Sequence, residues 1–252
     1  RGVMNRQKLA VRRDGKLHSI CADSVNLPAL GEGVDGVAFA FITRRNTIMP
    51  FAQELTAEQA VLAYLWGEST HSFATRPALA GQSVRVVGTD PFIIGPQGRK
   101  VNQFHDIVMA LNDKFPGQVK FFQYNTGGMG EVINVDHKGH KDLVRKTKRV
   151  PIDLMAALQR ADLRGTNRYE PGVFGTGEIV ATAEGPLDKW RAKSFYTTGE
   201  MEGYVKEIVA GRREYTERIM AEGLAPEIAR LAEDSFAAIE PKSKSQVAIP
   251  RE

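Results

Sequence analysis

The stretch GVAFAFITRRNTIMPFAQELTAEQAVLAYLWGES, residues 36–69, joins a strand signal to a helix signal and decides how we interpret the fold. Its first eight residues, GVAFAFIT, form a continuous apolar run between Gly36 and Arg44. A short apolar run without polar alternation is typical of a strand that is buried on both faces. We therefore predict a buried strand at 36–43, in the centre of a sheet.

The helix signal begins at Thr56. Thr56 is a favourable N-cap residue, and Gln59 stands three positions later as its capping-box partner. Leu55 precedes the cap and is placed to pack against Ala60 as a hydrophobic staple. Gly67 follows the apolar pattern, and glycine is favoured just past the end of a helix. The sequence therefore predicts a capped helix that ends near Gly67.

The rest of the chain carries strand and helix patterns in its first half and helix patterns towards its end. We predict strands at 83–88 and 118–125, helices at 103–115, 150–163, 201–222 and 226–239, and an irregular glycine-rich segment at 165–188. This order predicts a mixed α/β (α+β) fold, in which a mixed sheet has flanking helices and a helical C-terminal layer. We expect one domain over 1–240 and a disordered tail at 241–252.

Composition places the chain among ordinary globular proteins, with 252 residues, 42% apolar and 25% charged. The formal charge is only +4, and the basic run VRKTKR (144–149) has no interleaved aromatic residues, so we expect no nucleic-acid partner. A single cysteine, Cys21, suits a reducing compartment, and no apolar run approaches the length of a membrane span. We expect a cytoplasmic protein. Because the first residue is Arg1 and not Met, we also expect a fragment of a longer protein.

A glycine-rich loop, YNTGGMGE at 124–131, follows the strand predicted at 118–125. Glycine-rich loops after strands can present bare backbone N–H groups to an anion, but they also form ordinary turns. The P-loop pattern G-x-x-x-x-G-K-[ST] is missing from the chain. A phosphate cradle and a simple turn therefore both stay open from the residues alone.

Arg44 and Arg45 follow the apolar strand directly. The carboxyl ends of strands are where α/β proteins collect ligands, and the guanidinium fork suits phosphate or carboxylate. The alternative is a strand end whose cations lie in water.

Other short patterns favour structure over function. GEGVDG (31–36) matches the dinucleotide fingerprint, but a strand follows it where a helix is needed. DHKGH (136–140) matches no tetrahedral metal spacing, and we predict a polar turn there and no metal site. The remaining histidines are isolated, and Cys21 has no base near it in sequence.

Five short motifs, in this order, give the chain a resemblance to a known family. They are Phe41-Ile42-Thr43, Pro50, Leu55-Thr56 with Gln59, Pro91-Phe92, and Asn125-Thr126-Gly127. Over roughly residues 5 to 220 the chain resembles the C-terminal half of ATP-dependent phosphoenolpyruvate carboxykinase. The resemblance implies that fold and an enzyme that converts oxaloacetate and ATP to phosphoenolpyruvate, ADP and CO2 with Mg2+ and Mn2+. It also implies that the P-loop and the metal-binding residues belong to a missing N-terminal half of the same protein.

The resemblance implies roles for particular residues. Arg44 and Arg45 would handle phosphate or carboxylate, and Lys141 and Thr147 stand where the family has an arginine and a threonine near the adenine. Ser24 stands where the family has a phosphate-contacting arginine. The glycine loop would lie on the adenine and ribose side of the nucleotide, with contacts from Asn125, Thr126, Gly127, Gly128 and Gly130. A non-catalytic carboxykinase-like module for binding or assembly is the alternative function.

Overall fold

The computed structural model describes residues 8–13, 16–21, 36–71, 79, 82–90, 92, 94–135, 137 and 141–245. The chain divides into two compact units, residues 1–37 and residues 38–252. The first unit holds an antiparallel hairpin of β1 (Lys8–Arg13) and β2 (Lys16–Cys21). The expected bounds of 1–240 for one domain stay a prediction.

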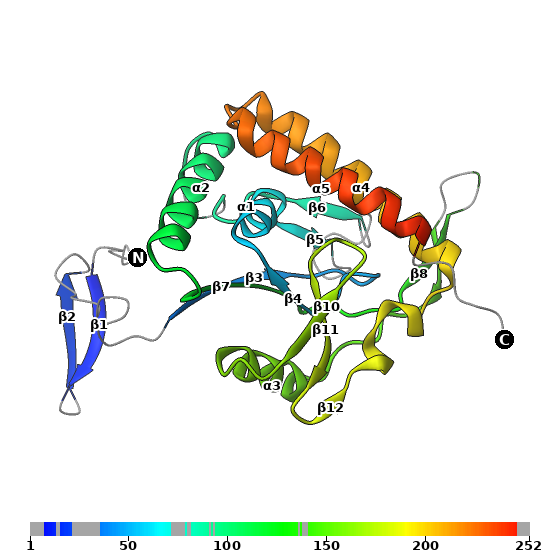
Figure 1. Cartoon of the computed structure of the whole chain (residues 1–252), viewed down its shortest axis with the longest axis horizontal. Helices are drawn as coiled ribbons and strands as arrows, with labels where there is room; N and C mark the ends of the chain where they lie inside the picture. Colours follow the sequence, from blue (N-terminus) through cyan, green and yellow to red (C-terminus); the bar gives the residue numbers. More distant parts are fainter. Residues whose placement is uncertain are drawn as a thin grey trace. The chain divides into compact units, whose positions relative to one another are not determined.

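The second unit contains one larger sheet, two small two-stranded sheets and the helices (Figure 1). Its strands are β3 (Val37–Thr43), β4 (Ala52–Leu55), β5 (Glu68–Thr70), β6 (Ser83–Arg85), β7 (Val119–Asn125), β8 (Val132–Val135), β9 (Lys141–Arg145), β10 (Arg168–Pro171), β11 (Gly177–Thr182) and β12 (Gly185–Pro186). Its α-helices are α1 (Ala57–Trp66), α2 (Gln97–Lys114), α3 (Ile152–Leu163), α4 (Thr198–Met220) and α5 (Pro226–Ser245), and two 3-10 turns lie at Asp188–Trp190 and Ala192–Ser194.

The larger sheet has the strand order β10-β11-β4-β7-β3, with β12 beside β11. Strand β4 is antiparallel to both β7 and β11. Phe39 stacks on Phe121 near the start of β3 and β7, and Thr126 donates its N–H to the Thr43 carbonyl where the two strands end. Because these contacts fall in the same order along both strands, β3 and β7 run in the same direction. The sheet is mixed, as the sequence predicts.

Strand β3 is wrongly predicted as a buried central strand. It lies at the end of the strand order, next to β7 alone among the described strands, and only Thr43 in it is fully buried. Phe39 and Phe41 pack against Phe104 of α2, whereas Ile42 on the opposite side is 62% exposed. The run therefore alternates, with phenylalanines inward and small or exposed residues outward. An apolar run does not reveal whether a second neighbouring strand exists, so the sequence could not separate an edge strand from a central one.

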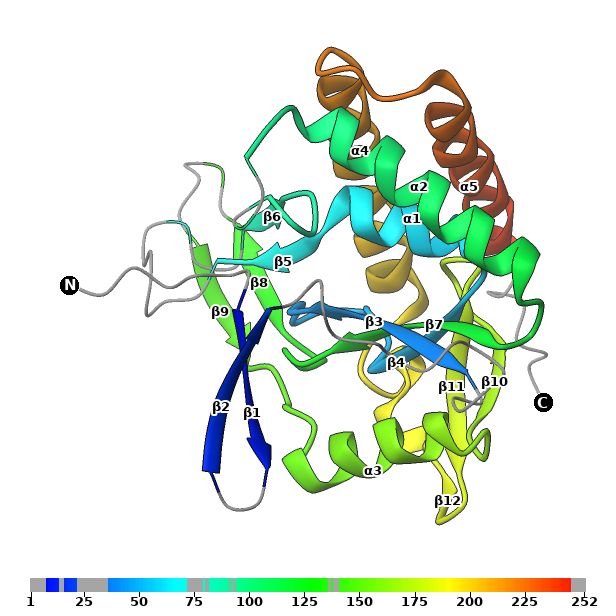
Figure 2. The same ribbon diagram turned by 90° about the vertical axis from the view of Figure 1, so that its left-hand side faces the viewer.

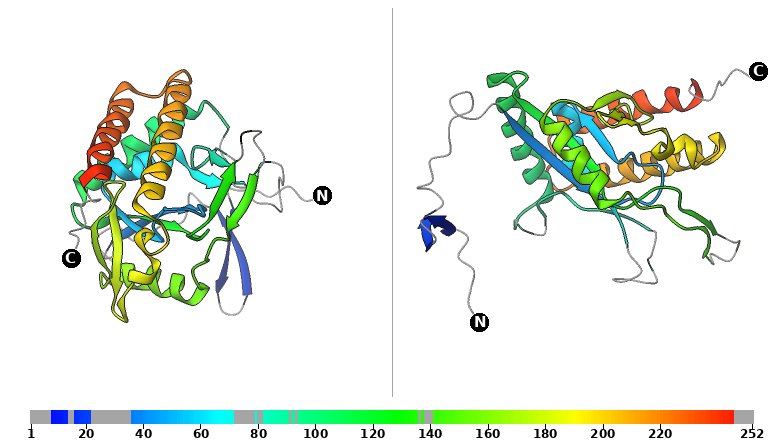
Figure 3. Two further views of the ribbon diagram at one scale, coloured as in Figure 1. Left: turned by 90° about the vertical axis from the view of Figure 1, so that its right-hand side faces the viewer. Right: turned by 90° about the horizontal axis from the view of Figure 1, so that it is seen from below.

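Helix α1 forms as predicted. Thr56 caps it with a complete capping box to Gln59, and Gly67 ends it in the left-handed conformation at φ 42°. Figures 1 and 2 show α1 between the sheet and the helices α2, α4 and α5, and most of its residues are buried. Helices α4 and α5 lie side by side and supply the helical C-terminal layer (Figure 3).

Helix α3 covers the other face of the sheet, below the strands in Figure 2. Its Asp162 is buried and accepts hydrogen bonds from the hydroxyl of Tyr124 on β7 and from that of Tyr169 on β10, both at 2.6 Å. Asn167 donates a third hydrogen bond to Asp162 at 2.7 Å. Burial is the larger cause that raises the pKa of both tyrosines, and the Asp162 carboxylate raises it further, so both hydroxyls stay protonated and act as donors. This network fastens α3 to two strands.

Several predicted bounds were wrong. Helix α2 begins six residues before the predicted start at 103, because its first turns carry glycine and charge in place of an apolar pattern. The strand predicted at 83–88 shortens to β6, and the segment predicted as irregular at 165–188 holds β10, β11 and β12. Helix α5 continues to Ser245, past its predicted end at 239, while residues 246–252 of the predicted tail lie outside the described residues.

Candidate functional site

The glycine loop after β7 is a turn whose backbone donors are already occupied. Every backbone N–H from Asn125 to Glu131 donates a hydrogen bond within the chain. The acceptors, in order, are the carbonyls of Phe51 and Thr43, the Asn125 side-chain oxygen, the carbonyls of Arg45 and Lys148, the Tyr196 hydroxyl and the Asn46 carbonyl. An anion could take one of these N–H groups only by displacing a partner in the protein. The loop is therefore not a cradle with free amides.

Glycine is required in this loop for two different reasons. A Cβ on Gly127 would lie 2.2 Å from the Arg45 carbonyl oxygen, so only glycine permits this approach of two backbone segments. Gly130 has φ 96°, a conformation that other residues rarely adopt, and a Cβ there would lie 2.7 Å from the Phe195 ring. Both glycines therefore serve the packing of the loop against its neighbours.

Asn125 organises the loop from within. Its side-chain oxygen accepts the N–H groups of Arg45 at 2.9 Å and Gly127 at 3.0 Å. Its side-chain nitrogen donates to the carbonyls of Met49 at 2.9 Å and Gly128 at 3.3 Å. The residue is fully buried and its amide uses its capacity on the protein. Asn125 is thus placed to hold the loop in shape, without a polar atom left over for a ligand.

The structure brings Thr147 to the loop but separates it from Lys141. The Thr147 hydroxyl donates to the Met129 carbonyl at 3.4 Å, and Gly128 packs directly against Thr147. Lys141 begins β9, and the strand carries the chain roughly 13 Å from Lys141 to Arg145 at about 3.3 Å per residue. The Lys141 side chain lies outside the described residues. Contacts of these residues with a nucleotide stay a prediction.

The side chains of Arg44 and Arg45 lie in different environments. Arg44 is exposed, and its backbone bridges to Ser69 at the start of the small β5–β6 sheet. Arg45 is only 2% exposed, and its Nη1 donates to the Ser83 hydroxyl at 2.6 Å. Successive residues of an extended chain point to opposite sides, which explains the difference. Arg45 is therefore the member of the pair that lies inside the protein.

Arg45 belongs to a buried charge cluster around Glu68, the first residue of β5. Arg85 binds one Glu68 oxygen at 3.1 Å, and Arg212 of α4 binds the other at 2.7 Å. Burial alone would raise the pKa of Glu68, but the charges of Arg212, Arg45 and Arg85 outweigh it and lower that pKa to about 2. The ionised Glu68 carboxylate is thus paired with Arg85 and Arg212, while Arg45 acts on it through its charge without forming an ion pair.

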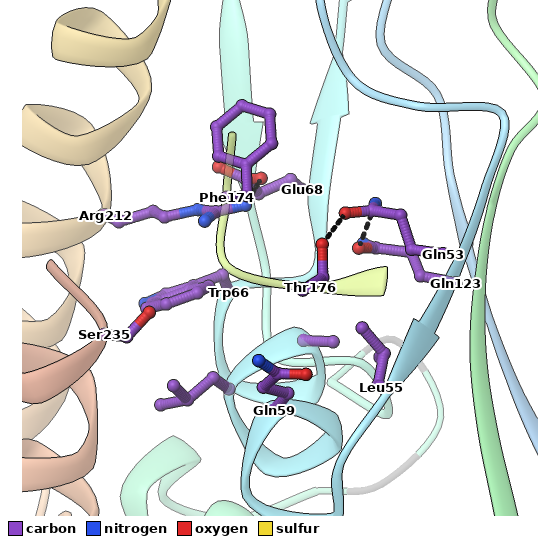
Figure 4. A pocket seen from close by; sticks show the side chains of 12 residues that line it. Gln53, Leu55, Gln59, Trp66, Glu68, Gln123, Phe174, Thr176, Arg212 and Ser235 are labelled. Carbon is purple, nitrogen blue, oxygen red and sulfur yellow. Dashed lines mark hydrogen bonds and ion pairs between the residues drawn. The ribbon is translucent and has the colours of Figure 1, made fainter. Parts of the chain in front are cut away.

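Arg212 is held by aromatic rings as well as by Glu68. Its guanidinium lies 4.3 Å from the centre of the Trp66 ring and 5.2 Å from that of Phe174, and Figure 4 shows it between these side chains. Such contacts compensate a buried cation in part. The cavity beside it, about 20 Å³, has room for about one water molecule. Arg212 is therefore a structural cation, buried against these two rings and paired with Glu68.

A cleft of about 570 Å³ opens beside the same cluster. Arg45, Arg85 and Ser83 line it together with Thr47, while exposed Glu207 and Glu214 of α4 also line it. The Arg45 Nε and the Thr47 hydroxyl are buried without a hydrogen-bond partner. The cleft is lined further by Thr70, Gln82, Glu131, Ile133, Tyr204, Ala210 and Gly211.

Sequence reasoning identified Arg45 and missed the rest of this cluster. Glu68 and Arg85 face each other in the register of β5 and β6, and Arg212 arrives from α4, 144 residues after Glu68. An acidic residue just after a helix and a basic residue in a short strand were the available signals, but no local pattern fixes their pairing.

Several candidate features fall outside the described residues. They include Ser24, most of GEGVDG and most of DHKGH. Within the described part of the chain, no group of three or more His, Cys, Asp or Glu side chains is placed to hold a metal ion. None of the described helices is both long enough and apolar enough to cross a membrane.

Comparison with known proteins gives a partial similarity. No family model matches the chain. The phosphoenolpyruvate carboxykinase (ATP) of Aeropyrum pernix is 34% identical to it over 110 residues, which are 43% of this chain. The matched segment spans only 20% of that relative. This partial similarity supports a relation between the chain and the ATP-dependent phosphoenolpyruvate carboxykinases.

Proposed function

We propose that the chain is the C-terminal part of an ATP-type phosphoenolpyruvate carboxykinase. The complete enzyme would convert oxaloacetate and ATP to phosphoenolpyruvate, ADP and CO2. The observation that carries the proposal is the 34% identity to the carboxykinase of Aeropyrum pernix over 110 residues. The mixed α/β architecture supports it, since strand β3, capped helix α1 and strand β7 carry three of the five motifs of the resemblance.

The chemistry of this reaction needs cations around the reacting groups. Decarboxylation leaves an enolate oxygen that attacks the γ-phosphoryl group, so one site must hold an enolate, a carboxylate and a triphosphate. Arg45 suits part of that task because its guanidinium is buried, has an unpartnered Nε and lines an open cleft. Arg44, exposed beside it, would contact the approaching substrate or the other half of the enzyme.

The nucleotide would lie near the glycine loop, on its adenine and ribose side. Because the loop amides are occupied, contacts would come from the hydroxyls of Thr126 and Thr147 and from Lys141, while Gly127, Gly128 and Gly130 would shape the loop by their packing against the protein. Asn125 would shape the loop without touching the nucleotide. ATP would thus be recognised here chiefly through its base and sugar.

The phosphates and the metal ions would be held elsewhere. The described residues offer no cluster of metal ligands, and we propose that the P-loop and the ligands for Mg2+ and Mn2+ come from an N-terminal part of the same protein. That part would be the chain's main partner, and the complete enzyme would act in the cytoplasm.

The test is phosphoenolpyruvate formation by the purified 252-residue chain, with oxaloacetate, ATP and both metals present. We expect no turnover from the chain alone and turnover from the protein extended by its upstream coding sequence. In the extended protein, Arg45→Ala should lower kcat/KM by roughly tenfold to a hundredfold, because charge-assisted hydrogen bonds contribute about 1.5 to 3 kcal/mol. Turnover by the chain alone, or no P-loop upstream, would contradict the proposal.

A non-catalytic carboxykinase-like module is the second candidate. Ser24, at the place of a phosphate-contacting arginine in the resemblance, favours it. An extended protein that folds and binds ATP without forming product would identify this alternative.

A further inference from the structure

We infer that the part of the cleft lined by Arg45, Arg85, Ser83 and Thr47, which we name its floor, is a binding site for a small oxyanion, of phosphate or carboxylate type, in this chain by itself. The inference shares Arg45 with the proposed function but does not depend on it. It requires no ATP, no metal and no second half of the protein.

The charge balance of the cluster favours binding of an anion. The two oxygens of Glu68 are taken by Arg85 and Arg212, at 3.1 Å and 2.7 Å. Arg45 forms no ion pair with any carboxylate of the described residues, although its side chain is almost completely buried. Buried cations are normally paired, because leaving one without an anion is costly. The cluster therefore carries positive charge that an anion from solution would neutralise.

Two hydrogen-bond donors of residues that line the cleft are unused. The Arg45 Nε and the Thr47 hydroxyl have no partner, and both residues line the cleft. Buried polar atoms in proteins are almost always hydrogen-bonded, so two unpartnered donors on residues that line a cleft indicate a missing acceptor. The oxygens of a phosphate or carboxylate are acceptors of the right kind for both.

The guanidinium groups of Arg45 and Arg85 are held in place by the protein before any ligand arrives. Arg85 is held by Glu68 and donates its Nη2 to the Ile208 carbonyl at 3.3 Å. It lies flat against Gly211, where a Cβ would be 2.4 Å from the Arg85 Nη1. Arg45 is held by Ser83 and by the backbone contact of its N–H with Asn125. A preorganised pair of forks loses little side-chain freedom on binding.

The surroundings of the floor favour a small ligand. Glu207 and Glu214 are exposed carboxylates that line the same cleft and would repel a long polyanion such as a nucleic acid. Glu131 also lines the cleft, and burial raises its pKa, so it can become a hydrogen-bond donor to an oxyanion more readily than an ordinary glutamate. We therefore expect this cleft to bind a small oxyanion and not a polyanion.

The experiment measures thermal stability and calorimetric binding of the 252-residue chain in an amine buffer without metal or nucleotide. Inorganic phosphate and malonate are the two probes, with sodium chloride at matched ionic strength as the blank. We expect at least one probe to bind with a dissociation constant in about the millimolar range and to raise the Tm as its concentration grows. Binding of both indicates a general oxyanion site, and binding of one identifies the class.

Variants locate the site. Arg164→Ala removes the same charge from an exposed position at the end of α3, outside the lining of the cleft, and should bind as the parent does, whereas Arg45→Ala should weaken binding at least tenfold. If Arg45→Ala fails to fold, Ser83→Ala and Thr47→Val, which remove only one hydroxyl each, should weaken binding by several-fold. Binding by neither probe, or equal affinity across these variants, overturns the inference. Either result leaves the carboxykinase proposal standing, because that proposal is tested by turnover.

Discussion

The substitution Glu68→Gln should be among the most destabilising single changes in the chain. It keeps the size of the side chain and removes the one carboxylate that Arg85 and Arg212 share. Because Glu68 is buried, water cannot solvate the guanidinium groups that lose their carboxylate partner. Removing one partner of a buried ion pair leaves an uncompensated charge and typically costs about 3 to 5 kcal/mol.

The pKa of Glu68 gives a second route to the same magnitude. The pKa falls from 4.5 to about 2 on folding, because the surrounding arginines outweigh burial. At about 1.4 kcal/mol for each pH unit, this corresponds to roughly 3 kcal/mol of stability at neutral pH. The two routes agree on the order of magnitude, and either value is a large fraction of the stability of a typical domain.

The sign of the pH dependence follows from the same pKa. Because the folded-state pKa lies below the unfolded-state value, the stabilisation is present above pH 4.5 and is lost as the pH falls towards 2. We therefore expect the difference in unfolding free energy between the parent and Glu68→Gln to be largest at neutral pH. It should shrink steadily between about pH 5 and pH 2.

Urea unfolding followed by circular dichroism, repeated across this pH range, is the assay. Glu217→Gln, on an exposed position of α4, is the matched control and should change the unfolding free energy by less than about 0.5 kcal/mol. A loss below about 1 kcal/mol for Glu68→Gln at pH 7 would refute the account of the cluster. So would a difference that stays constant down to pH 2.

Three further substitutions test the loop and the network under the sheet. Asp162→Ala should lower the free energy of unfolding by about 3 kcal/mol or more, because the donors Tyr124, Tyr169 and Asn167 lose their acceptor. Thermal unfolding measures this loss, and a loss under about 1 kcal/mol would contradict the network. Gly127→Ala should lower the Tm by several degrees, since its Cβ would overlap the Arg45 carbonyl, and an unchanged Tm would show that the loop can shift freely. Tyr196→Phe removes the acceptor of the Gly130 N–H and should cost about 1 to 2 kcal/mol in urea unfolding, where no change would argue against this hydrogen bond.

The elements that the sequence predicts well are those with local signals. The capping box of Thr56 and Gln59 and the terminal Gly67 fix α1 within its own residues, and the apolar run of β7 is buried as its composition indicates. The strands between 165 and 188 lacked such a signal. Their polar, glycine-rich sequence forms strands because β4 offers an open edge to β11, and this pairing joins residues more than 120 positions apart.

The candidate site, too, has features with a local sequence signal and features without one. Arg45 was found because its place after an apolar run is visible in sequence. The properties that make it a candidate are the absence of a carboxylate partner and the orphaned Nε, and both depend on where Glu68, Arg85 and Arg212 lie. Those positions come from tertiary packing, which no spacing in the sequence specifies.

The sequence predicts the glycine loop and Arg45 as separate features. In the structure, the glycine loop supports Arg45. The Asn125 side chain accepts the Arg45 N–H, Gly128 donates to the Arg45 carbonyl, and Gly127 is small enough to let the two segments touch. Arg45 is therefore held through its backbone on both sides by the loop, while Ser83 fixes its guanidinium. The N–H groups of the three glycines are hydrogen-bonded within the protein. The loop therefore offers no nest of N–H groups to an anion, and what it positions for an anion is the guanidinium of Arg45.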